Sequence, residues 1–240
     1  MSRKNKRSRA SQSLPVRQPP PGEAVSRRRI FIAAVAALLL AFVVGILLYK
    51  SSQARAAQQK AGRHRELLAS DHSPTLGKAD AKVHIVEFLD PACETCAVFY
   101  PHIKRLLASN PDTLRLSVRH VPFHKGSDQV VRILEAARNQ GKYWQALEAI
   151  FASQDQWAVN HAVQADRVWT SLGGIGLDLD RIRNDMNASE ISGRIEKDLG
   201  DASALGVTKT PEFFVNGRPL PSFGLEELQG LVREELHPAG

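Results

Sequence analysis

The only two cysteines of this 240-residue chain, Cys93 and Cys96, enclose two residues. An apolar stretch precedes them and a helical pattern follows, so the pair is expected where a strand gives way to a helix. At such a helix start, unpaired backbone N–H groups and the helix dipole favour a thiolate. The spacing therefore predicts a redox pair that exchanges disulfides with other proteins.

The two thiols are expected to differ in their roles. Cys93 lies at the exposed start of the helix, where its thiolate is the better stabilised, so it is predicted to be the nucleophile that attacks or receives a disulfide. Cys96, one turn later, is expected to be more buried and to resolve the mixed disulfide.

A Cys-x-x-Cys pair can also be half of a zinc site, but a closed site needs two further ligands at close spacing. The eight histidines contain one H-x-x-x-H pair, His120 and His124, and the chain has no third cysteine. The sequence therefore predicts neither a metal nor a cofactor. A metal site and a pair of inert thiols remain as alternatives to the redox pair.

A second candidate element is Thr210-Pro211, directly before the apolar run of residues 213–215. A cis proline here would present backbone without a competing N–H, so that an extended substrate could pair alongside it. From these residues alone, an ordinary trans proline that opens a strand remains the alternative.

The surrounding sequence predicts an α/β domain. Residues 82–89 are almost continuously apolar, as expected of a central strand covered on both faces. A helix over 93–109 and an alternating strand over 114–118 complete a parallel βαβ unit. The remaining expected elements are helices over 128–139 and 142–153, further helices up to about 205 in a stretch that looks all helical, strands at 212–215 and 218–220 joined by the turn Asn216-Gly217, and a closing helix over 225–236.

The N-terminal part predicts a membrane anchor. Nine basic residues and one acidic residue lie within 1–29, and residues 30–49 carry no charge. At about 1.5 Å per residue, this uncharged segment spans roughly 30 Å, enough to cross a bilayer. The positive-inside rule then places the N-terminus in the cytoplasm. A cleaved signal peptide is the alternative, because Ala54-Arg55-Ala56 resembles a cleavage site, although the apolar segment exceeds the usual length of about 7–15 residues.

The charge of the remaining chain argues against nucleic acid as a partner. Residues 51–240 hold 22 basic and 24 acidic residues, so the net charge of +7 comes from the N-terminal part. The expected organisation is a basic, disordered cytoplasmic tail (1–29), a transmembrane helix (30–49), a polar stalk (50–72), and a domain over 73–240 with a helical insertion at about 126–205.

Three motifs carry a family resemblance: Glu-Phe followed by Cys-x-x-Cys at 87–96, His-Val-Pro-Phe at 120–123, and Gly-Val-Thr-Lys-Thr-Pro-Glu-Phe-Phe-Val-Asn-Gly at 206–217. Over about residues 73–237 the chain resembles the DsbA-like thiol-disulfide oxidoreductases. The resemblance implies a thioredoxin-like α/β fold, with a central four-stranded mixed sheet, flanking helices and an inserted helical domain.

The resemblance also implies roles for single residues. Cys93 matches the attacking cysteine, Cys96 the resolving one, and Pro211 the cis proline that, with Thr210, contacts substrate. Glu87 matches a buried acid whose pKa is raised and which relays a proton to Cys96. A structural acid paired with a nearby lysine is the alternative for Glu87.

Two positions depart from the family pattern. Glu94-Thr95 stands between the cysteines where the strongly oxidising members carry Pro-His, and Glu94 should oppose negative charge on Cys93. We therefore expect a less oxidising couple, with Lys209 offsetting part of the effect. Ala92 stands where thioredoxins themselves usually carry tryptophan, which argues against a plain thioredoxin.

The expected function is disulfide formation in extracytoplasmic proteins by a monomer anchored in the inner membrane by a single pass, with its domain in the periplasm. Its substrates would be reduced or misoxidised proteins. Its redox partner would be a quinone-linked DsbB-like membrane protein or a protein that supplies reductant. The alternatives are a disulfide reductase or isomerase of the same compartment, and a non-catalytic peptide-binding or chaperone module.

Overall fold

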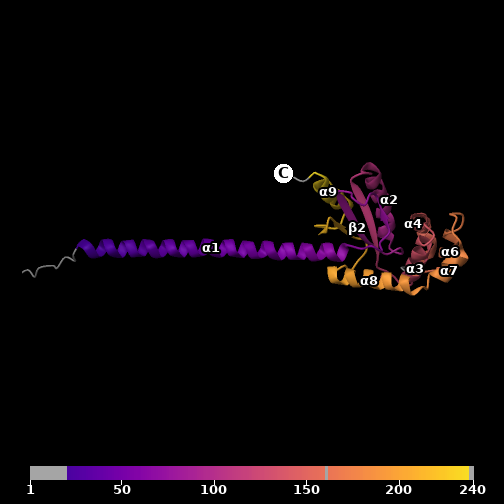
Figure 1. Ribbon diagram of the computed structural model, residues 1–240, viewed down its shortest axis with the longest axis horizontal. Helices are drawn as coiled ribbons and strands as arrows, with labels where there is room; N and C mark the ends of the chain where they lie inside the picture. The colour runs from indigo at the N-terminus through magenta and orange to yellow at the C-terminus, as the bar shows by residue number, and fades with distance from the viewer. Residues whose placement is uncertain (1–20, 160–161, 238–240) are drawn as a thin grey trace, which may run out of the picture. The chain divides into compact units, whose positions relative to one another are not determined.

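The computed structural model describes residues 21–159 and 162–237, in a chain that divides into two compact units, Met1–Ala57 and Gln58–Gly240. Helix α1 runs over Pro21–Leu68 (Figure 1). The expected disordered tail is therefore wrong for residues 21–29, where a proline suited to the first helical turn opens the helix. Residues 1–20 of that tail lie outside the described residues. Within α1, the segment Arg29–Ile46 is long and apolar enough to cross a membrane.

The second unit is built on a mixed sheet with the strand order β1-β3-β2-β6-β7. Strand β2 pairs in parallel with β3 and antiparallel with β6, which brings Glu87 opposite both Val118 and Phe213. The four predicted strands are all present. A fifth, β1, has two residues, too few to leave an alternating signal. The strands are β1 (Thr75–Leu76), β2 (Val83–Leu89), β3 (Leu114–His120), β6 (Glu212–Val215) and β7 (Arg218–Pro219).

The two faces of β2 contribute to two separate apolar clusters, because alternate side chains of a strand point to opposite faces. Ile85 and Leu89 belong to the larger cluster, which includes residues of α2 (Glu94–Ser109) and α9 (Leu225–Leu236). Val86 and Phe88 belong to the smaller one, which includes Leu68 at the end of α1. The folded unit therefore includes residues before the expected domain start at 73.

Within its described residues, the insertion between β3 and β6 holds six helices and a small two-stranded sheet of β4 (Ala158–Val159) and β5 (Ala162–Val163). The expectation of an all-helical stretch is wrong at this hairpin, whose strands are too short to show a two-residue period. The helices are α3 (Ser127–Arg138), α4 (Tyr143–Ala152), α5 (Gln154–Trp157), α6 (Ala165–Ser171), α7 (Leu179–Asp185) and α8 (Ser189–Leu205).

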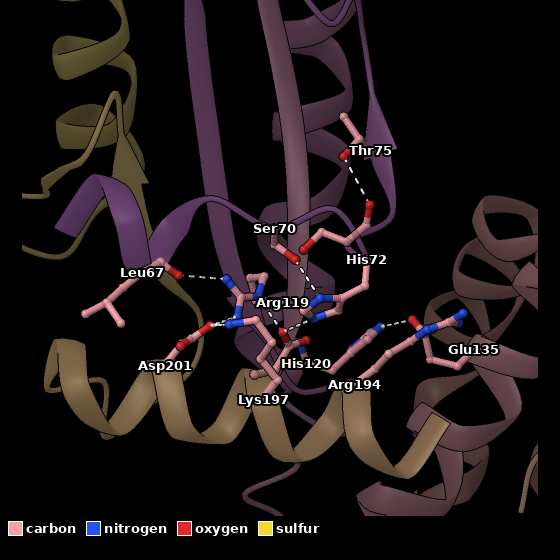
Figure 2. Close-up of polar contacts among 12 residues, drawn as sticks. Leu67, Ser70, His72, Thr75, Arg119, His120, Glu135, Arg194, Lys197 and Asp201 are labelled. Atoms are coloured by element: carbon pink, nitrogen blue, oxygen red, sulfur yellow. Dashed lines mark hydrogen bonds and ion pairs between the residues drawn. The ribbon is translucent and has the colours of Figure 1, made fainter. Parts of the chain in front are cut away.

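A buried ionic network fixes α8 against the sheet (Figure 2). The fully buried guanidinium of Arg119, on β3, donates to Asp198 and Asp201 of α8. It also donates to the carbonyl of Leu67 at 3.0 Å, and Asp198 lies 2.7 Å from the ring of His72. The network thus connects the end of α1, the sheet and the helix that leads into the loop of residues 206–211.

Candidate active site

The two cysteines lie at the start of α2, as predicted. Cys93 is the residue that caps the helix, in extended conformation, and Cys96 lies in the first turn. Cys96 is fully buried, and Cys93 is only 5 % exposed, less than its expected position at an exposed helix start suggests. Cys93 nevertheless borders a pocket of about 350 Å³, which is the route by which another sulfur can reach it.

The environment of Cys93 favours its thiolate. The pKa of Cys93 is lowered to about 6, chiefly by a hydrogen bond with the Cys96 side chain, although burial acts in the opposite direction. Hydrogen bonds from the Thr210 side chain and from the backbone of Cys96 and Thr95 lower it further. These backbone donors are the unpaired N–H groups of the first helical turn.

Cys96 shows the opposite behaviour. Its pKa is raised well above the ordinary value, first by burial and then by the hydrogen bond with Cys93 and the charge of Glu87. In the reduced protein the pair therefore holds one thiolate, on Cys93, and one thiol, on Cys96.

Glu87 lies on β2 beneath the pair and is completely buried. Neither of its carboxyl oxygens has a hydrogen-bond partner among the described residues, so the alternative of an acid paired with lysine has no support there. Burial raises the pKa of Glu87 to about 8, and the charge of Cys93 adds to this effect. The carboxyl group is therefore protonated at neutral pH and can give up a proton to a neighbour.

The loop between α8 and β6 brings Thr210 and Pro211 to the cysteines. The Thr210–Pro211 peptide bond is cis, as the family resemblance implies. The Sγ of Cys93 lies 3.2 Å from the carbonyl oxygen of Thr210, across 117 positions of sequence, and only the protonated thiol form of Cys93 can donate to this oxygen. Strand β6 begins directly after the proline and pairs with β2, where Phe213 lies opposite Glu87. This pairing fixes the position of the loop relative to Glu87.

The two charged residues that the sequence singled out also border the pocket. Glu94 and Lys209 both line it beside Cys93, and the Nζ of Lys209 lies 5.5 Å from the ring centre of Phe223. The contacts that lower the pKa of Cys93 come from other groups. The effect of Glu94 on the redox couple therefore stays a prediction.

Sequence reasoning missed a set of polar residues that hold the turn before Cys93. The buried Asp90 accepts from the N–H of Ala92 at 2.9 Å and from the backbone and ring of His124 at 2.8 Å each. The buried amide of Gln154 donates to the carbonyls of Pro91 and Cys93 at 2.8 and 3.1 Å. The Asp-Pro pair at the end of β2 was a possible signal for Asp90, whereas Gln154 left none.

His120 and His124, the one histidine pair with a spacing suited to a metal site, each contact a protein side chain. The ring Nε2 of His120 lies 3.0 Å from the hydroxyl of Tyr143, and His124 contacts Asp90. Within 21–159 and 162–237, no three His, Cys, Asp or Glu side chains are grouped so that they could hold a metal ion.

Comparison with known proteins gives a family for this geometry. Residues 69–234 match the family model described as thioredoxin. The Na⁺/H⁺ antiporter NhaA of Herminiimonas arsenicoxydans is 31% identical over 197 residues, which cover 80% of this chain and 31% of that protein. NhaA 3 of Salinispora tropica is 30% identical over 199 residues, 79% of this chain and 29% of that one. The chain thus spans about a third of the length of these curated relatives.

Solved structures resemble the same region. A thioredoxin-like oxidoreductase from Silicibacter pomeroyi DSS-3 is 30% identical with a TM-score of 0.63, covering 72% of this chain and 97% of that one. BdbD from Bacillus subtilis is 24% identical with a TM-score of 0.61, and the match covers 70% of this chain and 95% of BdbD. The thiol-disulfide exchange protein alpha-DsbA2 from Wolbachia pipientis is 19% identical with a TM-score of 0.63, covering 76% and 97%.

The predicted thioredoxin-like α/β fold with a mixed sheet is confirmed by these likenesses. The cysteine pair, the buried acid and the cis proline lie within the matched region. The chain belongs to the thioredoxin family, and its fold is that of a thioredoxin-like oxidoreductase and of the DsbA-type proteins.

Proposed function

We propose that this protein forms disulfides in proteins outside the cytoplasm through the Cys93–Cys96 pair. The observation that carries the proposal is the asymmetry of the pair, since the pKa of Cys93 is lowered to about 6 while that of Cys96 is raised. A stabilised thiolate favours the reduced form of a dithiol, so the disulfide form is driven to oxidise its partners.

The reaction begins with the Cys93–Cys96 disulfide. A substrate thiolate attacks the Sγ of Cys93, a substrate–Cys93 disulfide forms, and the bonding electron pair of the broken disulfide goes to Cys96. A second substrate thiolate then attacks the substrate sulfur of the mixed disulfide and releases Cys93 as a thiolate. The substrate has lost two electrons, and both cysteines are reduced.

Glu87 supplies the proton that Cys96 needs. Because the pKa of Cys96 is raised, its thiolate is unfavourable in the folded protein and must be protonated when the disulfide opens. With its pKa at about 8, Glu87 is protonated at neutral pH and can protonate Cys96 when the disulfide opens, then recover a proton from water. In the reverse direction the same carboxylate can take the proton from Cys96.

The substrate segment would lie in extended form against the loop of Thr210 and Pro211. The pocket beside Cys93 adjoins a second hollow of about 490 Å³ that contains Phe123, Leu199, Ala202 and Val207. Phe123 is 44% exposed there. Apolar side chains of a partly unfolded protein have a place to bind beside the reactive sulfur.

The apolar segment Arg29–Ile46 and the basic residues before it support an inner-membrane anchor with the N-terminus in the cytoplasm. We place the catalytic domain in the periplasm, as a monomer. Its reoxidation would fall to a quinone-linked DsbB-like membrane protein. If the domain instead works as a reductase or isomerase, a reductant-supplying protein would take that place.

The test uses the full chain in detergent, oxidised beforehand, with a reduced dithiol peptide as substrate. We expect stoichiometric oxidation of the peptide, and complete loss of it in Cys93→Ser. Efficient insulin reduction with no peptide oxidation would favour the reductase alternative. A Cys93→Ala variant that still complements a deletion strain would favour a non-catalytic peptide-binding module.

A further inference from the structure

A histidine outside the Cys-x-x-Cys motif borders the pocket into which Cys93 faces. His124 lines this pocket together with Cys93 and Thr210. Its ring Nδ1 lies 2.8 Å from Oδ2 of Asp90, and its own backbone N–H donates to the same oxygen at 2.8 Å. The ring and the main chain of His124 are thus both attached to one carboxylate.

That carboxylate is itself firmly held. Asp90 is fully buried, its Oδ1 accepts from the N–H of Ala92 at 2.9 Å, and its Oδ2 also accepts from the hydroxyl of Ser127 at 3.1 Å. An ionised carboxylate can only accept, so the His124 nitrogen that faces it carries the hydrogen. Proton exchange with a substrate in the pocket then involves the other ring nitrogen, Nε2.

We propose that His124, oriented by Asp90, carries the proton that the substrate sulfur loses or gains when it exchanges with Cys93. This inference rests on the proposed function and adds to it the acid–base group of the substrate side. Asp90 is the positioning residue of the pair, in the way that a carboxylate fixes the tautomer of a catalytic imidazole.

The proton balance assigns separate tasks to Glu87 and His124. Glu87 lies in the core beneath the cysteines, where it serves Cys96. The substrate sulfur approaches from the pocket, where His124 lies. A substrate thiol passes its proton to Nε2 as its sulfur attacks Cys93, and the imidazolium then releases that proton to water.

In the reverse direction the Cys93 thiolate attacks a substrate disulfide. The new bond joins Cys93 to one substrate sulfur, the substrate S–S bond breaks, and the electron pair goes to the other sulfur. The imidazolium of His124 protonates that leaving sulfur. An aliphatic thiolate needs this proton, whereas an aromatic thiolate is stable without it, because a leaving thiol of lower pKa leaves faster.

Two charged side chains line the same pocket as His124 and Cys93. They are Glu94, at the start of α2, and Lys209, on the loop before Pro211.

The experiment compares two disulfide substrates with the reduced full chain in detergent. One is bis-hydroxyethyl disulfide, whose leaving group is aliphatic, and the other is dithiobis-nitrobenzoate, whose leaving group is aromatic. We expect His124→Asn to lower the ratio of the aliphatic to the aromatic rate constant by about tenfold or more.

The backbone bond from residue 124 to Asp90 does not depend on the side chain, so the loop should keep its place in His124→Asn. His102→Asn, on the outer part of α2 where the ring contacts Arg105, is the matched control and should leave the ratio at its wild-type value. An unchanged ratio in His124→Asn, or an equal fall of both rate constants, would overturn the inference. A wild-type protein that reacts with neither disulfide would instead refute the proposed function.

Discussion

Two buried ionisable side chains lie one register position apart on neighbouring strands and face opposite sides of the sheet. Glu87 on β2 is opposite Val118, and Arg119 on β3 is opposite Phe88. Both side chains are fully buried. Arg119 has two carboxylates and a carbonyl as partners (Figure 2), whereas Glu87 has no hydrogen-bond partner among the described residues.

The difference separates a structural charge from a chemical one. A buried charge whose hydrogen bonds are all satisfied holds segments together, here β3, α8 and the end of α1. A buried acid without partners keeps its proton to a higher pH and can exchange it with the thiol above. One face of the sheet thus carries Arg119, which holds α8 and the loop after it in place, and the other face carries Glu87, which can supply a proton to the active site.

The largest expected effect is on the structural side of this comparison. Arg119→Met leaves Asp198 and Asp201 buried without their main counter-charge, so we expect a loss of about 3–5 kcal/mol in the free energy of unfolding. Urea denaturation of the full chain in detergent measures it. Arg105→Met, on the exposed side of α2, is the matched control and should change stability by less than about 0.5 kcal/mol. Equal stabilities of the two variants would remove the structural half of the comparison.

The chemical side should be visible in the pH dependence of stability. The folded-state pKa of Glu87 is about 8 against an ordinary 4.5, so between these values the folded protein binds more protons than the unfolded one. The contribution of Glu87 to the stability of the wild type is therefore fully present below pH 4.5 and is lost progressively as the pH rises from there through 8. Glu87→Gln carries no such proton and should avoid this loss, which amounts to roughly 3 kcal/mol by neutral pH.

The measurement is urea denaturation of the reduced wild type and of Glu87→Gln across this pH range. Glu190→Gln, an exposed acid on α8, serves as the control and should follow the wild-type curve. Parallel curves for the wild type and Glu87→Gln would show that the carboxyl group titrates normally and would end its assignment as a proton donor.

Much of this comparison was accessible from the sequence, but only where the signal is local or follows from the family resemblance. The Cys-x-x-Cys spacing, the apolar strand around Glu87 and the Thr-Pro pair predicted the elements and their residues. Asp90 with His124 and Gln154 with Cys93 meet across 34 and 61 positions, and such contacts have no local period to detect. The two-residue strands β4 and β5 were missed for the same reason.

Glu87→Gln should also slow catalysis. Removal of the proton that Cys96 receives is expected to lower the rate of peptide oxidation by about tenfold, most strongly at the pH where Glu87 is protonated in the wild type. Stopped-flow kinetics with the reduced dithiol peptide follows this rate. A wild-type rate in the variant would mean that water protonates Cys96 directly.

The smallest expected effect concerns the pocket mouth. Glu94→His replaces a negative charge beside Cys93 with a group that can be positive, so the thiolate should be better stabilised and the couple more oxidising. Because the site is partly open to water, we expect a rise in reduction potential of about 10–20 mV, equivalent to less than 1 kcal/mol. Equilibration with glutathione buffers measures it, and an unchanged potential would remove Glu94 from the electrostatic account.

The titration of Cys93 itself tests the account most directly. The reaction rate of the reduced full chain with iodoacetamide, followed as a function of pH, reports the fraction of Cys93 present as thiolate, while Cys96 stays buried and protonated. We expect a midpoint near the lowered pKa of Cys93, about 6. A midpoint near 9, the pKa of an unperturbed thiol, would contradict the proposed thiolate.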